Sequence, residues 1–109
     1  MASELLKVAL KPTCSNSETK LIDGVSGHTY TVLSITICET AGAAETFDLY
    51  VDDNDGNTDH YIYKSQALGA NETFEHTGRI VLEATDMLGF ITANSADIDV
   101  VVSYLDQTL

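Results

Sequence analysis

The sequence predicts an all-β fold, a single β-sandwich or jelly-roll-like domain of about seven to nine strands with an N-terminal arm. Three observations predict it. Apolar and polar residues alternate with a period of two in several short segments. Turn residues such as Gly, Asn and Asp separate these segments at regular intervals. No segment keeps the period of 3.6 that an amphipathic helix needs, and 109 residues suit one domain with one core.

The clearest strand is predicted over residues 29–39, followed by a turn of small residues at 41–44 and a second strand over 46–51. The pair is expected to form a hairpin. In the first strand, alternation places Thr31, Leu33, Ile35 and Ile37 on one face, opposite Tyr30, Val32, Ser34, Thr36 and Cys38. In the second strand, it places Phe47, Leu49 and Val51 on one face.

The rest of the chain continues the same rhythm. A polar loop at 52–59 precedes a half-buried strand over 60–64, and a turn at 69–71 precedes a short strand over 73–76. An apolar stretch at 80–82 is followed by strands over 87–92 and 98–105, with a loop at 94–96 between them. The alternation predicts a core between two sheets that includes Ile35, Ile37, Leu49, Val51, Val100 and Val102.

The N-terminal segment, residues 1–17, differs from this pattern. Leu6, Val8 and Leu10 alternate, but Pro12 and a polar run at 13–18 separate them from the next strand. We therefore divide the chain into an N-terminal arm, 1–17, and a β-sandwich domain, 18–109. The arm is expected either to contact other chains or to pair as an edge strand with the domain's own sheet.

The charge balance argues against two classes of partner. Five Lys and Arg against seventeen Asp and Glu give a net charge of −12, which repels phosphate backbones and anionic lipid head groups. We expect neither a nucleic acid nor a membrane partner, and no apolar run approaches the roughly 20 residues that span a bilayer. Cys14 and Cys38 have no metal-ligand spacing, and two free thiols are predicted, with a single disulfide as the open alternative.

Motifs for catalysis or cofactor binding are missing from the sequence. In the segment 24–28, GVSGH, the second glycine comes one position too early for a nucleophile elbow, and no helix is predicted after it. His28, His60 and His76 are too scattered for a zinc site. No glycine opens a phosphate-binding loop. We predict no catalytic, cofactor-binding or metal-binding residue, no cofactor, and no enzymatic activity.

The acidic loop at 52–59 raises the question of calcium. Its carboxylates could supply oxygen ligands, but counting back from Gly56 as the sixth position of an EF-hand puts Val51 at the first ligand position and Ile62 at the twelfth. We therefore predict a solvated hairpin loop whose side chains bond their own backbone, and calcium binding is the open alternative. The residues concerned are Asp52, Asp53, Asp55 and Asp59.

Most of the chain resembles a known class of proteins. The resemblance rests on YTVLSITIC at 30–38, ETAGAA at 39–44, TFDLYV at 46–51, LGANET at 68–73, IVLEATD at 80–86 and IDVVVSYL at 98–105. In this order, these elements resemble the small β-sandwich virion proteins of tailed bacteriophages, over about Thr19 to Asp106. The chain departs from the pattern at Glu39, where Asn is common, and at Thr85, where Gly often precedes Asp86.

The resemblance implies a virion structural protein. The specific expectation is a capsid decoration, or cement, protein on the capsid exterior that binds the major capsid protein, self-associates as a homo-oligomer and is assembled in the host cytoplasm. One alternative is a tail, adaptor or fibre component of the virion. Another is a carbohydrate- or calcium-binding β-sandwich module that uses the 52–59 loop and an aromatic platform of Tyr50, Tyr61 and Tyr63.

Overall fold

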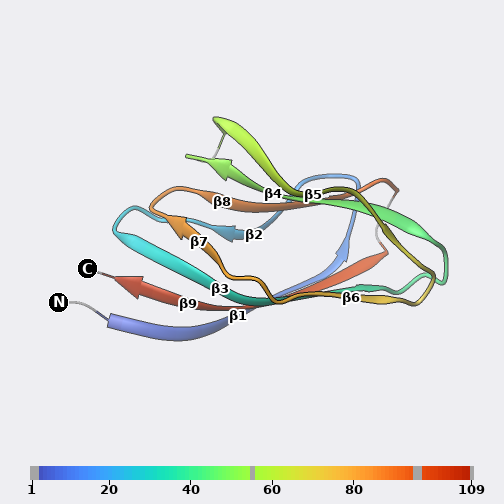
Figure 1. The fold of residues 1–109 in the computed structure, drawn as a ribbon, viewed down its shortest axis with the longest axis horizontal. Helices are drawn as coiled ribbons and strands as arrows, with labels where there is room; N and C mark the ends of the chain where they lie inside the picture. Colours follow the sequence, from blue (N-terminus) through green and yellow to red (C-terminus); the bar gives the residue numbers. More distant parts are fainter. Residues whose placement is uncertain (1–2, 55, 95–96, 109) are drawn as a thin grey trace.

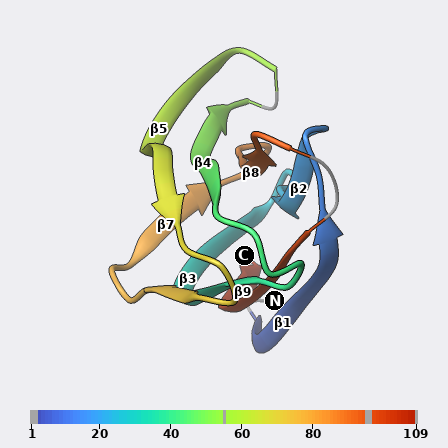
Figure 2. The ribbon, with the colours of Figure 1, turned by 90° about the vertical axis from the view of Figure 1, so that its right-hand side faces the viewer.

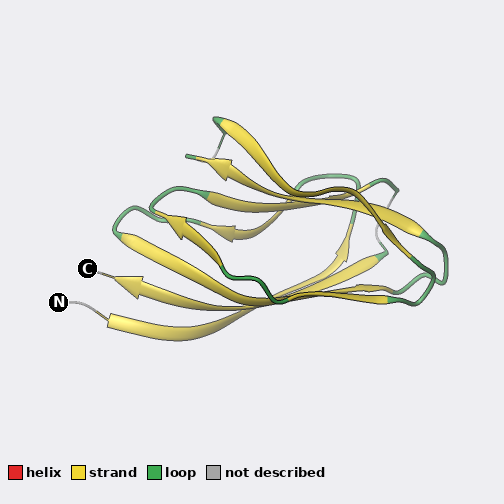
Figure 3. Ribbon diagram, viewed as in Figure 1, coloured by secondary structure: helices red, strands yellow, loops and turns green. Residues whose placement is uncertain are grey.

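The computed structural model describes residues 3–54, 56–94 and 97–108 and confirms the all-β prediction (Figures 1 and 3). Among these residues, no helix is long and apolar enough to cross a membrane. Nine strands form two antiparallel sheets that face each other. The strands are β1 (Ser3–Cys14), β2 (Thr19–Asp23), β3 (His28–Glu39), β4 (Glu45–Asp53), β5 (Thr58–Leu68), β6 (Thr73–His76), β7 (Ile80–Glu83), β8 (Met87–Thr92) and β9 (Ile98–Thr108).

The strand order is that of a jelly roll. One sheet has the order β1-β9-β3-β6, with β7 also paired to β3, and the other has the order β2-β8-β4-β5. Because β6 pairs with residues 35–38 of β3 and β7 with residues 29–32, these two short strands act as one interrupted strand. With β6 and β7 counted as one strand, each sheet has four strands, and the chain passes repeatedly from one sheet to the other. This is the double-sheet arrangement of a jelly roll.

The predicted core lies between the sheets. Ile35, Ile37, Leu49, Val100 and Val102 are fully buried, and Val51 packs against them from a partly buried position. Aromatic rings fill the centre, where Phe47 and Phe90 stack with their centroids 5.3 Å apart. Burial of these side chains supplies the main favourable free energy of folding.

The predicted alternation is wrong in the first half of β3. Tyr30 and Val32 are buried, at 5% and 0% exposure, whereas Thr31 and Leu33 are only partly covered. The register between β3 and β9 shifts between Val32 and Ser34, which marks a β-bulge. An extra residue in a strand moves all following side chains to the opposite face, so alternation cannot be extrapolated through it.

The segment expected as an N-terminal arm, 1–17, supplies an edge strand. β1 pairs antiparallel with β9 of the same chain, from Ser3 opposite Thr108 to Lys11 opposite Val100. At its end, Cys14 lies in the core at 3% exposure. Figure 1 shows β1 and β9 side by side, with the two chain ends at the same end of the molecule. That these residues also contact other chains stays a prediction.

Both cysteines are free. Cys14 pairs with Ile98 and Cys38 with Asp99, so β9 lies between the two strands that carry them. Two strands that flank a third are roughly 9.5 Å apart, beyond the 7 Å limit between the Cα atoms of a disulfide. The fold therefore keeps the two thiols apart, in agreement with the prediction of two free cysteines.

Candidate interaction surfaces

The sheet that contains β1 turns an apolar face away from the core. In β9, Val101, Ser103 and Leu105 alternate with buried residues and therefore point outward. Residues of β1 lie opposite them, Leu10 beside Val101 and Leu6 beside Leu105. We call this surface the outer apolar face; it consists of Leu6, Val8, Leu10, Leu33, Val81, Val101 and Leu105.

The outer apolar face is widely open to solvent. Leu6 is 77% exposed and Leu10 is 64% exposed, and a shallow hollow of about 390 Å³ lies between β1, Leu33 and β9. Single exposed apolar residues are ordinary, but a contiguous group of this kind marks an interaction surface. Sequence alternation pointed to Leu6, Val8 and Leu10, but Val81 and Val101 join them only through strand pairing.

Acidic side chains lie toward the rim of this face. Glu4 is the second residue of β1, Asp99 is the second residue of β9, and Glu75 and Glu83 lie on the short strands at the far side. Most residues between them are apolar or carry hydroxyl groups, such as Thr31, which pairs with Val81, and Gln107 lies next to Glu4. An apolar centre with a charged rim is the usual anatomy of a protein interface, and it is conspicuous in a chain of net charge −12.

A charge cluster around the buried Asp106 fastens β1 to the sheet at the other face of the same strands. The Nζ of Lys7 lies 2.8 Å from Asp106 Oδ2, and the Nδ1 of His28 lies 2.7 Å from Asp106 Oδ1. Hydrogen bonds from Lys7 and then from His28 lower the pKa of the Asp106 carboxyl. The cluster opens into a hollow of about 500 Å³ between the edge strands β1 and β2, but Lys7, His28 and Asp106 already bond one another, so the role of the cluster is structural.

Glu39 is a second structural carboxylate, and sequence analysis missed its role. It is 1% exposed, and its side chain accepts backbone N–H bonds from Ala41, Gly42 and Ala43 at 2.8 to 3.1 Å. The N–H of Asn71 donates a fourth bond at 2.9 Å. These bonds, that of Asn71 first, lower the pKa of the Glu39 carboxyl. The departure from the phage pattern at this position therefore joins two turns that are far apart in sequence.

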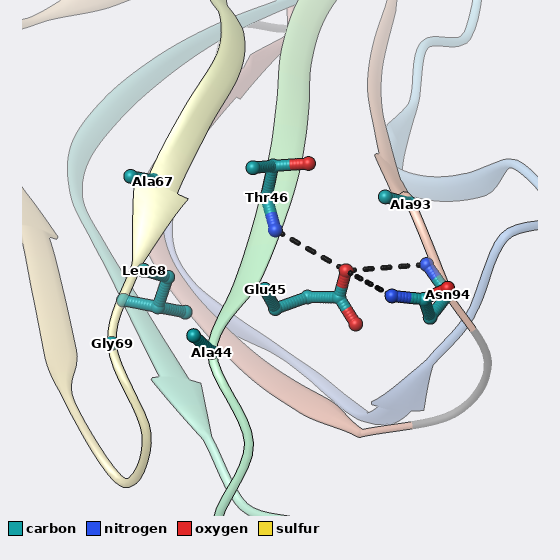
Figure 4. A pocket seen from close by; sticks show the side chains of 8 residues that line it. All are labelled: Ala44, Glu45, Thr46, Ala67, Leu68, Gly69, Ala93 and Asn94. Atoms are coloured by element: carbon teal, nitrogen blue, oxygen red, sulfur yellow. Dashed lines mark hydrogen bonds between the residues drawn. The ribbon is translucent and has the colours of Figure 1, made fainter.

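The end of the sandwich near Glu45 holds a small hollow of about 360 Å³ (Figure 4). The Oε1 of Glu45 accepts bonds from the backbone of Thr46 and from both nitrogens of Asn94, each at 3.2 Å. Close by, burial and then the neighbouring Glu45 raise the pKa of the Asp97 carboxyl. Ala44, Ala67, Leu68, Gly69 and Ala93 complete the lining.

The acidic loop differs in part from the solvated loop predicted for 52–59. Asp52 is 7% exposed, because it lies within β4, paired on one side with Asp59 and on the other with Met87. Within the loop, the backbone N–H of Asn57 donates to the backbone carbonyl of Asp53, and the side-chain amide of Asn57 donates to the Asp53 carboxylate. Asp55 lies outside the described residues. Over the described ranges, no group of three or more His, Cys, Asp or Glu is placed to hold a metal ion.

The aromatic platform expected in the carbohydrate-binding alternative does not form. Tyr50 is 4% exposed and its hydroxyl bonds Glu18. Tyr63 packs against the core, and its hydroxyl lies 2.8 Å from His76 Nδ1. Of the three tyrosines named for this platform, Tyr61 alone is largely exposed, at 48%. One exposed ring does not make a stacking surface for a sugar.

The comparisons with known proteins concern structure alone, since no protein-family model and no curated protein sequence matches the chain. The acidic stable capsid of Helicobacter pylori bacteriophage KHP30 contains a similar chain, with a TM-score of 0.54 and 16% identity over 100% of this chain and 94% of that one. A chain of the T13 IBDV viral particle gives a TM-score of 0.56 and 10% identity, over 97% of this chain and 31% of that one.

Lower similarity extends beyond viruses. A protein of the Bacillus endospore appendages, described as disulfide-linked pili, gives a TM-score of 0.47 at 10% identity, over 100% of this chain and 88% of that one. At these identities the likeness shows the fold and not the activity. Two neighbours with a TM-score above 0.5 come from a phage capsid and a virus particle, and the KHP30 chain matches along nearly its whole length.

Proposed function

We propose that the chain is a bacteriophage virion structural protein, and specifically a capsid decoration protein that binds the major capsid protein on the capsid exterior. The observation that carries the proposal is the outer apolar face, presented on a jelly roll that matches a KHP30 capsid chain over 94% of that chain's length. On this proposal the protein is made in the host cytoplasm, acts in many copies and has no enzymatic activity.

The physical requirements of such a role fit the fold. A protein that reinforces a shell needs a rigid body and a wide contact surface, and it needs no deep pocket. Two sheets packed over a core of fully buried residues give the rigid body. The outer apolar face spans β1, β9, β3 and β7, and an apolar centre inside a polar rim excludes water from a contact once it forms.

The charge of the chain adds a constraint on its partner. Because Glu4, Glu75, Glu83 and Asp99 surround the apolar centre, a complementary surface carries basic residues around its own apolar patch. The large negative charge of the remaining surface keeps unbound copies in solution and steers them toward such a surface. We propose that the exterior of the major capsid protein shell has this character.

Recruitment to particles tests the proposal. Capsids assembled without this chain are mixed with purified wild type, with Val101→Glu in the centre of the face, or with Val25→Glu, which changes a residue 53% exposed in the turn before β3. We expect wild type and Val25→Glu to sediment with the capsids and Val101→Glu to lose at least about tenfold in affinity. Failure of the wild type to bind, or unchanged binding of Val101→Glu, would overturn the proposal.

A further inference from the structure

The four sheet edges of the sandwich are not alike. Exposed edges are normally protected by short strands, bulges or charges, because unpaired backbone groups recruit other chains. β2 has five residues and a register shift, and β6 and β7 have four residues each. β5 has two register shifts against β4 and a positive φ at Ser65. These three edges are therefore protected against pairing.

β1 has fewer of these protections, because the one charged side chain between Leu5 and Leu10 is Lys7, which is paired with Asp106. It has 12 residues and pairs with β9 without a register shift from Ser3 to Lys11. Among the described residues, no strand pairs with the edge of β1 that faces away from β9. Figure 2 shows β1 at the rim of the molecule, with β9 between it and β3. Leu5, Leu6, Val8 and Leu10 are each more than half exposed. A long, regular and apolar edge is the kind that accepts another strand.

We propose that β1 pairs antiparallel with β1 of a second copy of this chain, about a two-fold axis at Val8. In that register Val8 lies opposite Val8 of the second copy, and Leu6 lies opposite Leu10. Lys7 lies opposite Ala9, whereas an axis at Lys7 would place two ammonium groups directly opposite each other, which is destabilising. The pairing joins the two outer apolar faces into one continuous surface.

The charge distribution makes the β1 edge the place where two copies can meet with the least repulsion. Glu4, Lys7 and Lys11 give β1 a net charge of +1, so the rest of the chain carries −12 − 1 = −13. Two copies repel each other over most of their surface, and the repulsion is weakest where each presents β1. A two-fold contact also needs a surface that complements itself, and an antiparallel strand pair meets that condition.

The inference goes beyond the proposed role and does not depend on it. Strand pairing is measured on the purified chain, whereas the proposed role is tested by binding of the chain to capsids. Sedimentation equilibrium over a concentration series compares wild type with Val8→Lys and with Val81→Lys. Val8 and Val81 are matched, at 54% and 56% exposure, but Val81 lies on β7, away from the β1 edge. We expect wild type and Val81→Lys to dimerise and Val8→Lys to lose at least about tenfold in association.

A crosslinking experiment tests the register directly and needs no loss of function. Residues directly opposite in an antiparallel pair have Cβ atoms roughly 4.5–5.5 Å apart. In a Cys38→Ser background, Val8→Cys should therefore form a covalent dimer under mild oxidation, and Val81→Cys should not. A wild type that stays monomeric up to about 1 mM, a dimer that Val8→Lys leaves unchanged, or crosslinking at both positions equally would overturn the proposal.

Discussion

Gly89 in β8 is expected to tolerate no side chain, because the ring of Tyr50 lies directly over it. A Cβ at Gly89 would lie 2.4 Å from Tyr50 Cε2 and 2.6 Å from Cζ, whereas carbon atoms pack best at about 3.5–4.0 Å. The ring must then move by about 1 Å. It is 4% exposed and its hydroxyl bonds Glu18, so it has little room to do so.

We therefore expect Gly89→Ala to lower the free energy of unfolding by about 1–3 kcal/mol, the usual cost of overpacking a core. In a domain of this size, each kcal/mol corresponds to a fall of about 4–8 °C in Tm. Urea titration of Gly89→Ala measures the loss, and the same substitution in a Tyr50→Ala background measures its cause.

Without the ring, alanine at this position should cost close to nothing or stabilise the strand, since glycine weakens strands by about 0.5–1 kcal/mol. The coupling between the two substitutions should then be at least about 1 kcal/mol. A loss below about 0.5 kcal/mol for Gly89→Ala alone, or an equal loss in both backgrounds, would refute this account of the contact.

Three further predictions follow from burial and from the carboxyl groups. Ile37→Ala, at a fully buried position, should cost about 2–4 kcal/mol in a urea titration, whereas Val81→Ala on the exposed face should cost less than about 0.5 kcal/mol. The lowered pKa of Asp106 means that its stabilisation is complete above the ordinary Asp pKa of about 3.9 and is lost as the pH falls through the lowered value. The difference in unfolding free energy between wild type and Asp106→Asn should shrink on acidification, and a constant difference would contradict the assignment. For Asp97 the sign is opposite, because its pKa is raised: its stabilisation is present below about pH 3.9 and is lost as the pH rises through the raised value. Asp97→Asn should therefore gain stability relative to wild type as the pH rises, as measured by denaturant midpoints across the acidic and neutral range.

Much of the fold could be predicted from alternation alone. The strand over 29–39 and the core residues of its second half were predicted correctly because one face of a sheet is buried and the side-chain period is two. The first half was not, because the bulge after Val32 depends on how β3 pairs with β9. Two adjacent apolar residues, Val32 and Leu33, are the local sign of that extra residue.

The candidate surfaces were harder to predict, because they depend on contacts between distant segments. Leu6 and Val81 belong to one face only after β1 has paired with β9 and β7 with β3. Likewise, nothing around Glu39 indicates that Asn71, 32 residues away, will donate to its carboxylate. A single sequence shows the local period of each strand, but the order of strands in a sheet follows from the whole chain.

The pairing of the first and last strands has a practical consequence for protein engineering. Ser3 lies opposite Thr108, and their hydroxyl oxygens are 2.6 Å apart. A peptide genetically fused at either end would therefore leave the molecule from the same corner. A short linker between the ends, with new termini opened between β4 and β5, would give a circular permutant that keeps all nine strands and every ladder of both sheets.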